Sequence, residues 1–266
     1  MAFAAEASGQ KTVMQALRRF WPTASPEAPA REPAAATWDF HCHLLPAVDD
    51  GLRSLEEAQA AIEGMRTLGY LGAVLTPHIY PGVYDNTPDR LREAFHTLEQ
   101  SIGSNFGLHL AAEYFADETM FAAIDREDVL YLPVGNKKIV LVEFPALMPA
   151  PCGMDVLIAL SRAGYQPVLA HVERYRHIQL EQAVWLSKIE QSGAWLQCDI
   201  GSLVGQYGPH PQAFARGLLD RELPTLWGTD LHRVTQLERY MAPGLAVLTK
   251  SGQRINAVLE ELAARW

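Results

Sequence analysis

The sequence predicts an α/β fold in which about seven parallel strands, each followed by a helix, close into a barrel. From Thr37 onward, short apolar segments alternate with longer helical patterns, as in βα units around a parallel sheet. The chain has 266 residues, a length at which such barrels are commonly single domains. Six of the seven expected strands also end in a histidine or a carboxylate, at the face where barrels build their active sites.

Residues 1–36 differ from the rest of the chain in composition. The segment Lys11–Trp21 has the spacing of about two turns of an amphipathic helix. The following segment, PTASPEAPAREPAAAT, contains four prolines and many alanines, which is typical of an extended linker. We therefore expect a flexible N-terminal extension, with a short docking helix for a partner, a membrane surface or a neighbouring subunit as the alternative.

The expected strands are short apolar segments of similar length. They are Thr37–His41, Gly72–Pro77, Leu108–Glu113, Ile139–Phe144, Pro167–His171, Trp195–Ile200 and Thr225–Asp230. The helices expected between them begin at Ser54, Thr87, Met154, Leu180 and Pro211. The first helix has the clearest boundaries, because Ser54 and Glu57 form a capping-box pair and Gly69 ends the pattern.

Composition excludes several classes of protein. A formal net charge of −9 argues against a nucleic-acid partner, since nucleic-acid binders carry clustered lysines and arginines. Three cysteines, far apart and odd in number, indicate a reduced protein rather than a disulfide framework. No apolar run approaches the length of a membrane span, and Met1–Ala7 lacks the basic start and long apolar core of a signal peptide. We expect a cytoplasmic protein.

Potential metal ligands gather at the ends of the expected strands. In chain order they are His41, His43, His78, Glu113, Glu143, His171, Asp230 and His232. Only the sixth strand breaks the series. Imidazoles and carboxylates are typical ligands of zinc, manganese or iron in sites that keep positions open for water and substrate. With Asp49 and Asp50 nearby, the set exceeds the needs of one ion, so we expect two or three metals that share a carboxylate, as in phosphoryl-transfer sites.

Each of these residues also has a structural explanation when it is considered alone. A histidine at a strand end is often simply hydrogen-bonded, and Glu113 or Glu143 could cap a helix or form an ion pair. The joint occurrence at six strand ends favours the metal site. The other histidines are expected in structural or surface roles: His96, His109, His177 and His210.

Several short motifs follow one another along the chain: DFHCHLLPAVDDG, TPH, AAEYF, LVEFP, AHVERY, GSLVG and GTDLH. Together they resemble the polymerase and histidinol phosphatase (PHP) superfamily, and within it the bacterial tyrosine-protein phosphatases of capsule and exopolysaccharide loci. The similarity runs from Thr37 to the C-terminus. It implies a distorted (β/α)7 barrel, similar to the TIM barrel, over residues 37–266, with a trinuclear metal centre and with residues 1–36 outside it.

The resemblance also implies how the ligands are divided among the metals. The first metal takes His41, His43, Glu113 and Asp230; the second takes Glu113, Glu143 and His171; the third takes Asp50, His78 and His232. Asp50 is preferred as the second aspartate of the DDG motif, with the adjacent Asp49 as the alternative; Asp49 otherwise braces the loop. The expected cofactor is two or three divalent ions, manganese first, with iron, zinc or cobalt as alternatives.

Arg174, in the motif HVERY, is expected to reach over the metals and bind phosphate oxygens with its planar guanidinium group. The alternative is an ion pair with a neighbouring carboxylate such as Glu173. Relatives tend to place a further phosphate-binding arginine a few residues after the DLH motif. Here Leu237 stands at that position, and the nearby candidates are Arg233 and Arg239.

The reaction that this resemblance implies is hydrolysis of a phosphomonoester without a covalent intermediate. A metal-bridging hydroxide attacks phosphorus, and the metals and Arg174 neutralise the equatorial oxygens. The expected catalytic residues are Arg174, Asp230 and His43. A cysteine-based phosphatase needs an arginine six residues after its cysteine, and no cysteine of this chain is followed by one at that distance.

Substrate choice depends on weaker signals. Tyr80 and Tyr84 lie in the loop IYPGVYDNTPD after His78, where they could flank an aryl phosphate or pack the loop itself. Tyr84 and Arg233 join Arg174 as expected substrate contacts. The resemblance favours the phosphotyrosine tail of a polysaccharide-export tyrosine autokinase, and thus regulation of capsule or exopolysaccharide assembly. The alternatives are a small phosphate such as histidinol phosphate, a nuclease-like reaction, or a metal-stabilised scaffold that binds a kinase.

Overall fold

The computed structural model describes residues 37–263, apart from 104, 222, 224, 253 and 254. The amphipathic segment and the linker predicted within residues 1–36 lie outside the described residues. Within the part of the chain that is described, no helix combines the length and the apolar character needed to cross a membrane.

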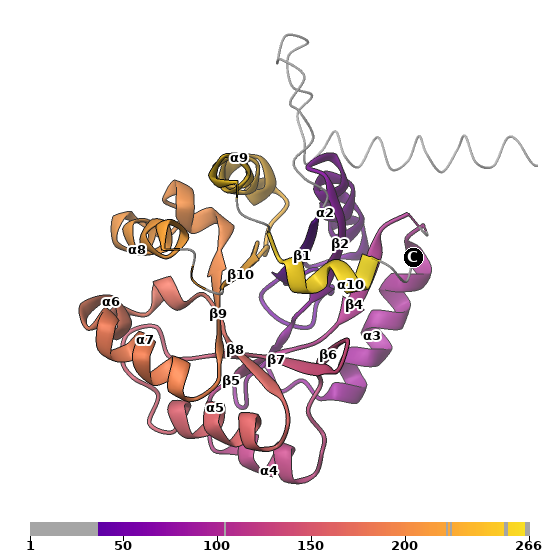
Figure 1. Ribbon diagram of the computed structural model, residues 1–266. Helices are drawn as coiled ribbons and strands as arrows, with labels where there is room; N and C mark the ends of the chain where they lie inside the picture. The colour runs from indigo at the N-terminus through magenta and orange to yellow at the C-terminus, as the bar shows by residue number, and fades with distance from the viewer. Residues whose placement is uncertain (1–36, 104, 222, 224, 253–254, 264–266) are drawn as a thin grey trace, which may run out of the picture.

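The strands form two sheets whose members are almost all parallel (Figure 1). The smaller sheet has the order β1-β2-β4 and consists of β1 (Thr37–Cys42), β2 (Tyr70–Leu75) and β4 (Gly107–Leu110). The larger sheet has the order β10-β9-β8-β7-β5-β3, with β3 (His78–Ile79), β5 (Glu113–Phe115), β7 (Lys137–Glu143), β8 (Gln166–Leu169), β9 (Trp195–Asp199) and β10 (Thr225–Gly228). The short strand β6 (Leu132–Val134) pairs with β7 in the antiparallel direction.

The sheets curl, so that the last strand returns to the first. Cys42, at the end of β1, forms a parallel bridge with Leu231, just after β10. The backbone N–H of Asp230 donates to the carbonyl of His41 at 2.8 Å, and the N–H of His43 donates to the carbonyl of Leu231 at 3.1 Å. The predicted parallel α/β architecture is confirmed, in the form of a curled sheet in two parts rather than one continuous ladder of seven strands.

Two of the expected strands are interrupted in the structure. The segment expected at 72–77 overlaps β2, which ends at Leu75, and β3 begins just after Pro77; the segment expected at 108–113 covers most of β4 and the first residue of β5. Pro77 accounts for the first break, because it has no N–H to donate to a ladder. Each segment thus leaves the smaller sheet and continues in the larger one, which makes His78 and Glu113 partners in the β3–β5 pair.

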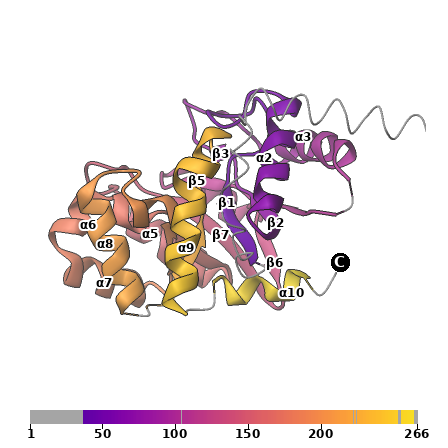
Figure 2. The same cartoon turned by 90° about the horizontal axis from the view of Figure 1, so that it is seen from above.

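Helices lie around the strands, as the second view shows (Figure 2). They are α2 (Leu55–Thr67), α3 (Pro88–Ser101), α4 (Thr119–Asp125), α5 (Gly153–Arg162), α6 (Arg176–Leu180), α7 (Gln182–Gln191), α8 (Pro209–Asp220), α9 (Ala242–Ser251) and α10 (Glu260–Ala263). Shorter turns are η1 (Val172–Arg174), η2 (Ile200–Val204), η3 (Leu237–Met241) and η4 (Ala257–Leu259).

The helix starts follow from their capping residues. The predicted N-cap at Ser54 is confirmed, since its hydroxyl accepts the N–H of Glu57 at 3.3 Å. The carboxylate of Glu57 accepts the N–H of Arg53 at 2.8 Å, one residue earlier than a capping box requires. Thr87 caps α3 by accepting the N–H of Arg90. The pattern expected from Leu180 corresponds to α7, and the sequence analysis missed α4, α6, α9 and α10.

Strand β1 is held tightly, which matters because it carries two expected ligands. A Cβ atom on Gly72 of β2 would come within 2.5 Å of the Trp38 ring, so glycine is required for this close approach. The carboxylate of Asp39 accepts the N–H and the hydroxyl of Thr229 at 2.9 and 2.6 Å. Asn256 donates to the carbonyl of Trp38 at 2.9 Å. The end of β1 is thereby fixed against β10.

Candidate metal centre

Four buried side chains converge at the ends of β1 and β10 and at the start of β5. His41 and His43 stand two residues apart at the end of a strand, so their rings point to the same side. Their Nε2 atoms lie 3.1 Å apart, and each is 3.2 to 3.4 Å from Oε2 of Glu113 and Oδ1 of Asp230. These four residues form the first group that could hold a metal ion.

Hydrogen bonds around the two histidines direct their Nε2 atoms into this group. Nδ1 of His41 lies 3.2 Å from the amide oxygen of Gln197, and Nδ1 of His43 lies 2.8 Å from Oδ2 of Asp49. With the ring proton donated to these oxygens, each Nε2 keeps a lone pair toward the carboxylates, as metal-binding histidines do. Lone pairs and carboxylate oxygens that converge in a buried space require a cation between them. The donor set therefore fits divalent metals.

The electrostatics of the site also favour a bound cation. Burial alone lowers the pKa of His41, but the carboxylates of Glu113 and Asp230 outweigh it and raise the pKa to about 9. Burial acts to raise the pKa of Glu113, but His41 and His78 hold it well below its usual range. For Asp230, burial is likewise outweighed by His232 and His41, which keep its pKa well below the usual range. The carboxylates stay ionised and favour a neighbouring cation.

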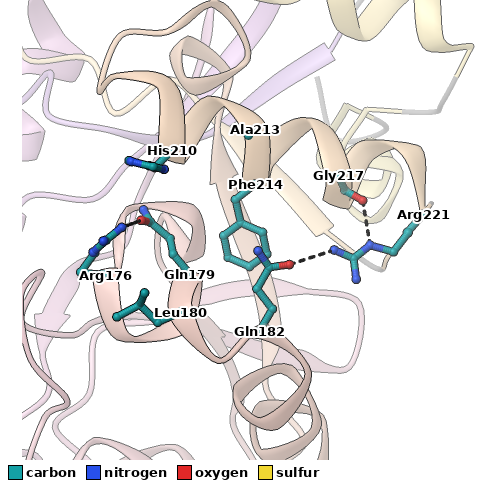
Figure 3. A pocket seen from close by; sticks show the side chains of 9 residues that line it. All are labelled: Arg176, Gln179, Leu180, Gln182, His210, Ala213, Phe214, Gly217 and Arg221. Atoms are coloured by element: carbon teal, nitrogen blue, oxygen red, sulfur yellow. Dashed lines mark hydrogen bonds between the residues drawn. The ribbon is translucent and has the colours of Figure 1, made fainter.

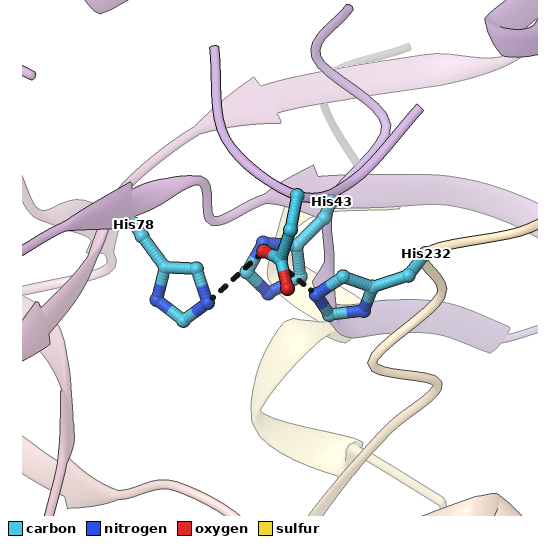
Figure 4. A group of neighbouring side chains, drawn as sticks. His43, His78 and His232 are labelled. Atoms are coloured by element: carbon cyan, nitrogen blue, oxygen red, sulfur yellow. Dashed lines mark ion pairs between the residues drawn. The ribbon is translucent and has the colours of Figure 1, made fainter. Parts of the chain in front are cut away.

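The second group is His43, Asp50, His78 and His232, and it is more open to solvent (Figure 4). Oδ1 of the half-exposed Asp50 lies 3.6 Å from Nε2 of His78 and 3.4 Å from Nε2 of His232. The ring of His232 stacks on that of His43, with centroids 4.0 Å apart. Nδ1 of His232 lies 2.9 Å from the carbonyl oxygen of Asp230, which leaves its Nε2 free to face Asp50.

Asp49 differs from its neighbour Asp50 in every contact. Its buried carboxylate lies 2.8 Å from Nδ1 of His43 and accepts the backbone N–H of His78 at 3.0 Å. It also accepts the N–H of Gly51 at 2.9 Å, which closes the DDG loop. Asp49 therefore orients two candidate ligands, while Asp50 is the aspartate that joins a candidate metal-binding group.

The third group is His78, Glu113 and Glu143. Nδ1 of His78 lies 3.4 Å from Oε2 of Glu113 and 3.3 Å from Oε1 of Glu143, so its two ring nitrogens face two different groups. Nε2 of His171 lies 2.9 Å from Oε1 of Glu113 and 3.9 Å from Oε2 of Glu143. The nine expected ligands thus lie together, with His78 between two groups.

Arg174 lies beside the first group and forms an ion pair with Asp230, one of its members. Its Nη1 is 2.7 Å from Oδ2 of Asp230 and 3.4 Å from Oδ2 of Asp199, and its guanidinium group lies 4.4 Å from the centre of the Tyr207 ring. The ion pair with a neighbouring carboxylate that was the alternative is therefore present, but its partners are Asp230 and Asp199 and not the suggested Glu173. Glu173 instead accepts the backbone N–H of Asp199 at 3.0 Å, because successive residues of the η1 turn point in different directions.

Strand β9 supplies residues that the sequence analysis missed. The amide oxygen of Gln197 accepts the N–H of His171 at 2.6 Å and faces His41, while its Nε2 donates to Asp199 at 3.0 Å. The first of these bonds supports His171 in a left-handed backbone conformation with a φ of 30°, which is uncommon outside glycine. The available signal was the segment WLQCD, whose period of two places both polar side chains on one face.

Of the three further candidates for substrate contact, Arg233 and Tyr84 touch the second group or its loop, while Arg239 contacts a neighbouring tyrosine. Nη1 of Arg233 lies 2.6 Å from the carbonyl oxygen of Asp50 and therefore holds the DDG loop. Tyr84 stacks on the ring of His78 with centroids 5.2 Å apart and an interplanar angle of 11°. The guanidinium group of Arg239 lies 5.0 Å from the centre of the Tyr240 ring. Contact of these side chains with substrate stays a prediction.

Two cavities lie near these elements. One, of about 360 Å³, is lined by Glu143, His171 and Arg174 together with aromatic and aliphatic side chains. The other, of about 340 Å³, lies between α6, α7 and α8 and is lined by residues that include Arg176 and Arg221 (Figure 3). The candidate metal ligands line only the first of these two, which is therefore the cavity that belongs to the site.

The chain has clear relatives among known proteins. The profile of a family described as capsular polysaccharide synthesis, CpsB/CapC, matches residues 37–260. The chain belongs to the CpsB/CapC family. It is 33% identical to the tyrosine-protein phosphatase YwqE of Bacillus subtilis over 235 residues, which cover 85% of this chain and 89% of YwqE. It is 25% identical over 239 residues to the tyrosine-protein phosphatase CpsB of Streptococcus agalactiae, with coverages of 85% and 96%.

The solved structures agree with the CpsB/CapC assignment. A study of YwqE from Bacillus subtilis and CpsB from Streptococcus pneumoniae describes them as unique metal-dependent tyrosine phosphatases. The matching chain from that study superposes with a TM-score of 0.72 at 27% sequence identity and covers 83% of this chain and 89% of its own length. The resemblance predicted from the motifs is confirmed.

Proposed function

We propose that this CpsB/CapC family member is a metal-dependent tyrosine-protein phosphatase that regulates capsule or exopolysaccharide assembly. The observation that carries the proposal is the convergence of imidazole and carboxylate groups beside a guanidinium group and an open cavity. The names of the relatives and the description of the family support it.

The proposed metal ligands are His41, His43, Asp50, His78, Glu113, Glu143, His171, Asp230 and His232. Bound divalent ions would polarise the phosphoryl oxygens and activate water for attack on phosphorus. Nitrogen and oxygen donors suit manganese, iron, zinc and cobalt, with manganese our first choice. His43, His78 and Glu113 each belong to two of the groups, which favours two or three ions over one.

The protein contributes position and charge to the reaction. Asp49 and Gln197 fix the ring orientation of His43 and His41 through their Nδ1 atoms. Arg174 is held at the edge of the ligand cluster, where its planar fork can bind equatorial phosphate oxygens. Because Asp230 contacts both Arg174 and the histidines, it aligns the phosphate-binding group with the metals.

A thiol nucleophile does not fit this site. Burial raises the pKa of Cys42 and of Cys198 well above the ordinary value, and it also raises that of Cys152. A cysteine nucleophile needs the opposite, a lowered pKa in an electropositive and accessible place. The hydrolysis therefore depends on the metal ligands and Arg174.

The finer points of architecture and setting are also proposals. The curled sheet corresponds to a distorted (β/α)7 barrel in which β2 and β3 together count as one strand and β4 and β5 together count as another. The segment after β10 bridges to the end of β1 and closes the barrel. The substrate is the phosphotyrosine tail of a bacterial tyrosine autokinase, and the setting is the cytoplasm. The names of the relatives support a phosphotyrosine protein as substrate, the family description supports the link to capsule synthesis, and three unpaired cysteines support the reducing compartment.

The experiment is a measurement of phosphate release from a phosphotyrosine peptide and from histidinol phosphate. The enzyme is stripped of metal by a chelator and refilled with manganese, iron, zinc or cobalt, and is compared with Arg174→Ala and His41→Ala variants. Metal-dependent turnover of the peptide, lost in both variants and insensitive to thiol alkylation, supports the proposal. Turnover of the small phosphate alone, or silence with every metal, contradicts it.

A further inference from the structure

The cavity beside the metal ligands has a lining of two chemical kinds. It combines the ionisable side chains of Glu143, His171 and Arg174 with aromatic and aliphatic groups that include Tyr80 and Phe115. Its volume of about 360 Å³ is in the range of small-molecule binding sites. A ligand that matches both kinds of lining carries a charged group attached directly to an apolar body.

The aromatic part of the cavity lining is preformed. The rings of Tyr80 and Phe115 stack almost in parallel, with centroids 3.9 Å apart and an interplanar angle of 4°. The backbones of Tyr80 and Tyr84 exchange two hydrogen bonds, of 3.1 and 2.7 Å, which fix the loop that carries Tyr80. A flat aromatic surface of this kind favours another aromatic ring.

The mouth of the cavity exposes two large apolar side chains. Leu147 is 84% and Met148 is 65% exposed, in the loop between β7 and α5. The loop is anchored just before these two residues, since Phe144 donates its N–H to the Tyr175 hydroxyl at 2.9 Å and the carbonyl of Ala146 accepts the N–H of Arg176 at 3.0 Å. Apolar side chains held in water next to a site indicate a surface that contacts a ligand.

We propose that this cavity binds the aromatic ring of the substrate's phosphotyrosine, while Leu147 and Met148 contact an apolar side chain next to it in the peptide. The inference rests on the proposed function. With the phosphate at Arg174, the attached ring enters the adjoining space and meets the Tyr80 and Phe115 pair. An alkyl phosphate has no ring to pack against Tyr80 and Phe115, so the cavity selects aryl over alkyl phosphates. It also selects peptides with an apolar residue next to the phosphotyrosine over peptides with a polar residue there.

The first experiment tests the mouth of the cavity in the metal-loaded full-length chain. The Leu147→Ser, Met148→Ser double variant is compared with Val184→Ser, an exposed apolar residue on α7 that does not line this cavity. The substrates are two phosphotyrosine peptides that differ only in a leucine or a serine after the phosphotyrosine. We expect the double variant to raise KM for the leucine peptide about tenfold and to abolish the preference between the peptides, with Val184→Ser unchanged.

The second experiment tests the aromatic part of the cavity lining, formed by Tyr80 and Phe115. Tyr80→Ser should lower kcat/KM for phenyl phosphate about tenfold while kcat/KM for glycerol phosphate changes little. Inorganic phosphate should inhibit all variants as it inhibits the wild type, because the phosphate end is untouched. A labelled peptide with a non-hydrolysable phosphonate in place of the phosphate measures binding without turnover. Its affinity for the variants should fall by the same factors.

The outcomes separate this inference from the function on which it rests. A wild-type enzyme that releases no phosphate from any aryl phosphate contradicts the proposed function and, with it, this inference. An active wild type with unchanged peptide preference in the double variant and unchanged aryl selectivity in Tyr80→Ser contradicts the inference alone. Weaker inhibition by inorganic phosphate in the variants also contradicts it, because the substitutions would then act on the phosphate end.

Discussion

Arg174 and Asp230 form a partly buried ion pair in which Nη1 lies 2.7 Å from Oδ2. The other carboxylate oxygen of Asp230, Oδ1, lies 3.4 Å from Nε2 of His41 and 3.3 Å from Nε2 of His43. One carboxylate therefore joins the proposed phosphate-binding group to the proposed metal ligands. The backbone of Asp230 has a φ of 48°, an uncommon conformation that places its side chain between the two.

Asp230→Asn should lower kcat for a phosphotyrosine peptide by at least about 100-fold, because the amide keeps the shape but loses the charge that holds Arg174 and a metal. Metal content, measured by atomic absorption after dialysis, should fall as well. Asp220→Asn, an exposed carboxylate on α8, is the control and should behave as the wild type. Full activity with full metal content in Asp230→Asn would remove Asp230 from the site.

Arg174→Lys tests the phosphate-binding role by itself. Lysine keeps the positive charge but loses the planar fork and the contact with the Tyr207 ring, so we expect kcat/KM to fall about 10²- to 10³-fold. Metal content should stay at the wild-type value, since the guanidinium group is not a ligand. Arg176→Lys, on the exposed start of α6, is the matched control. Loss of metal in Arg174→Lys would show instead that the arginine mainly supports the ligands.

Gln197→Leu removes an amide that supports two candidate ligands at once. The N–H of His171 and Nδ1 of His41 would lose their partner in a buried place, at a cost of about 1 to 3 kcal/mol in the free energy of unfolding. Metal affinity should fall about 10- to 100-fold, as for other residues that orient metal-binding histidines. Metal titration and urea unfolding measure both effects, with the exposed Gln191→Leu on α7 as control. Unchanged metal affinity would make Gln197 a purely structural residue.

The convergence of the candidate ligands could be predicted from the sequence because its signals are local. Whether His41 and His43 share a face depends only on their spacing within a strand, and the position of His171 or Asp230 at a strand end follows from the end of an apolar run. The convergence of these residues then follows from the parallel topology, which the alternating pattern indicates. Such inferences need no knowledge of side-chain contacts.

Other features depend on contacts between elements and escaped the sequence analysis. The partner of Arg174 is set by how η1 and β10 meet, so the adjacent Glu173 was the wrong choice. Gln197 is a neutral amide, and its one local signal was its place on the same strand face as Asp199. The division of the second strand is different, because Pro77 was a local signal that the strand pattern should have respected.

Glu173 is a fully buried carboxyl group. Its Oε1 accepts the N–H of Asp199 at 3.0 Å and the hydroxyl of Ser202 at 2.6 Å, while Oε2 has no hydrogen-bond partner among the described residues. Burial, and after it the charge of Asp199, raises the pKa of Glu173 to about 7. The folded chain therefore holds a proton here that the unfolded chain releases at a lower pH.

Glu173→Gln should change how stability depends on pH. In the wild type the native state binds the extra proton between the unfolded pKa of 4.5 and about 7, so the free energy of unfolding falls as pH rises through this window and no further above it. Glutamine does not titrate, so its stability relative to the wild type should rise between pH 5 and 8, by up to about 3 kcal/mol. Urea unfolding across this range measures the difference, with the exposed Glu190→Gln on α7 as control. Parallel profiles for Glu173→Gln and the wild type would mean that Glu173 stays ionised in the folded chain throughout.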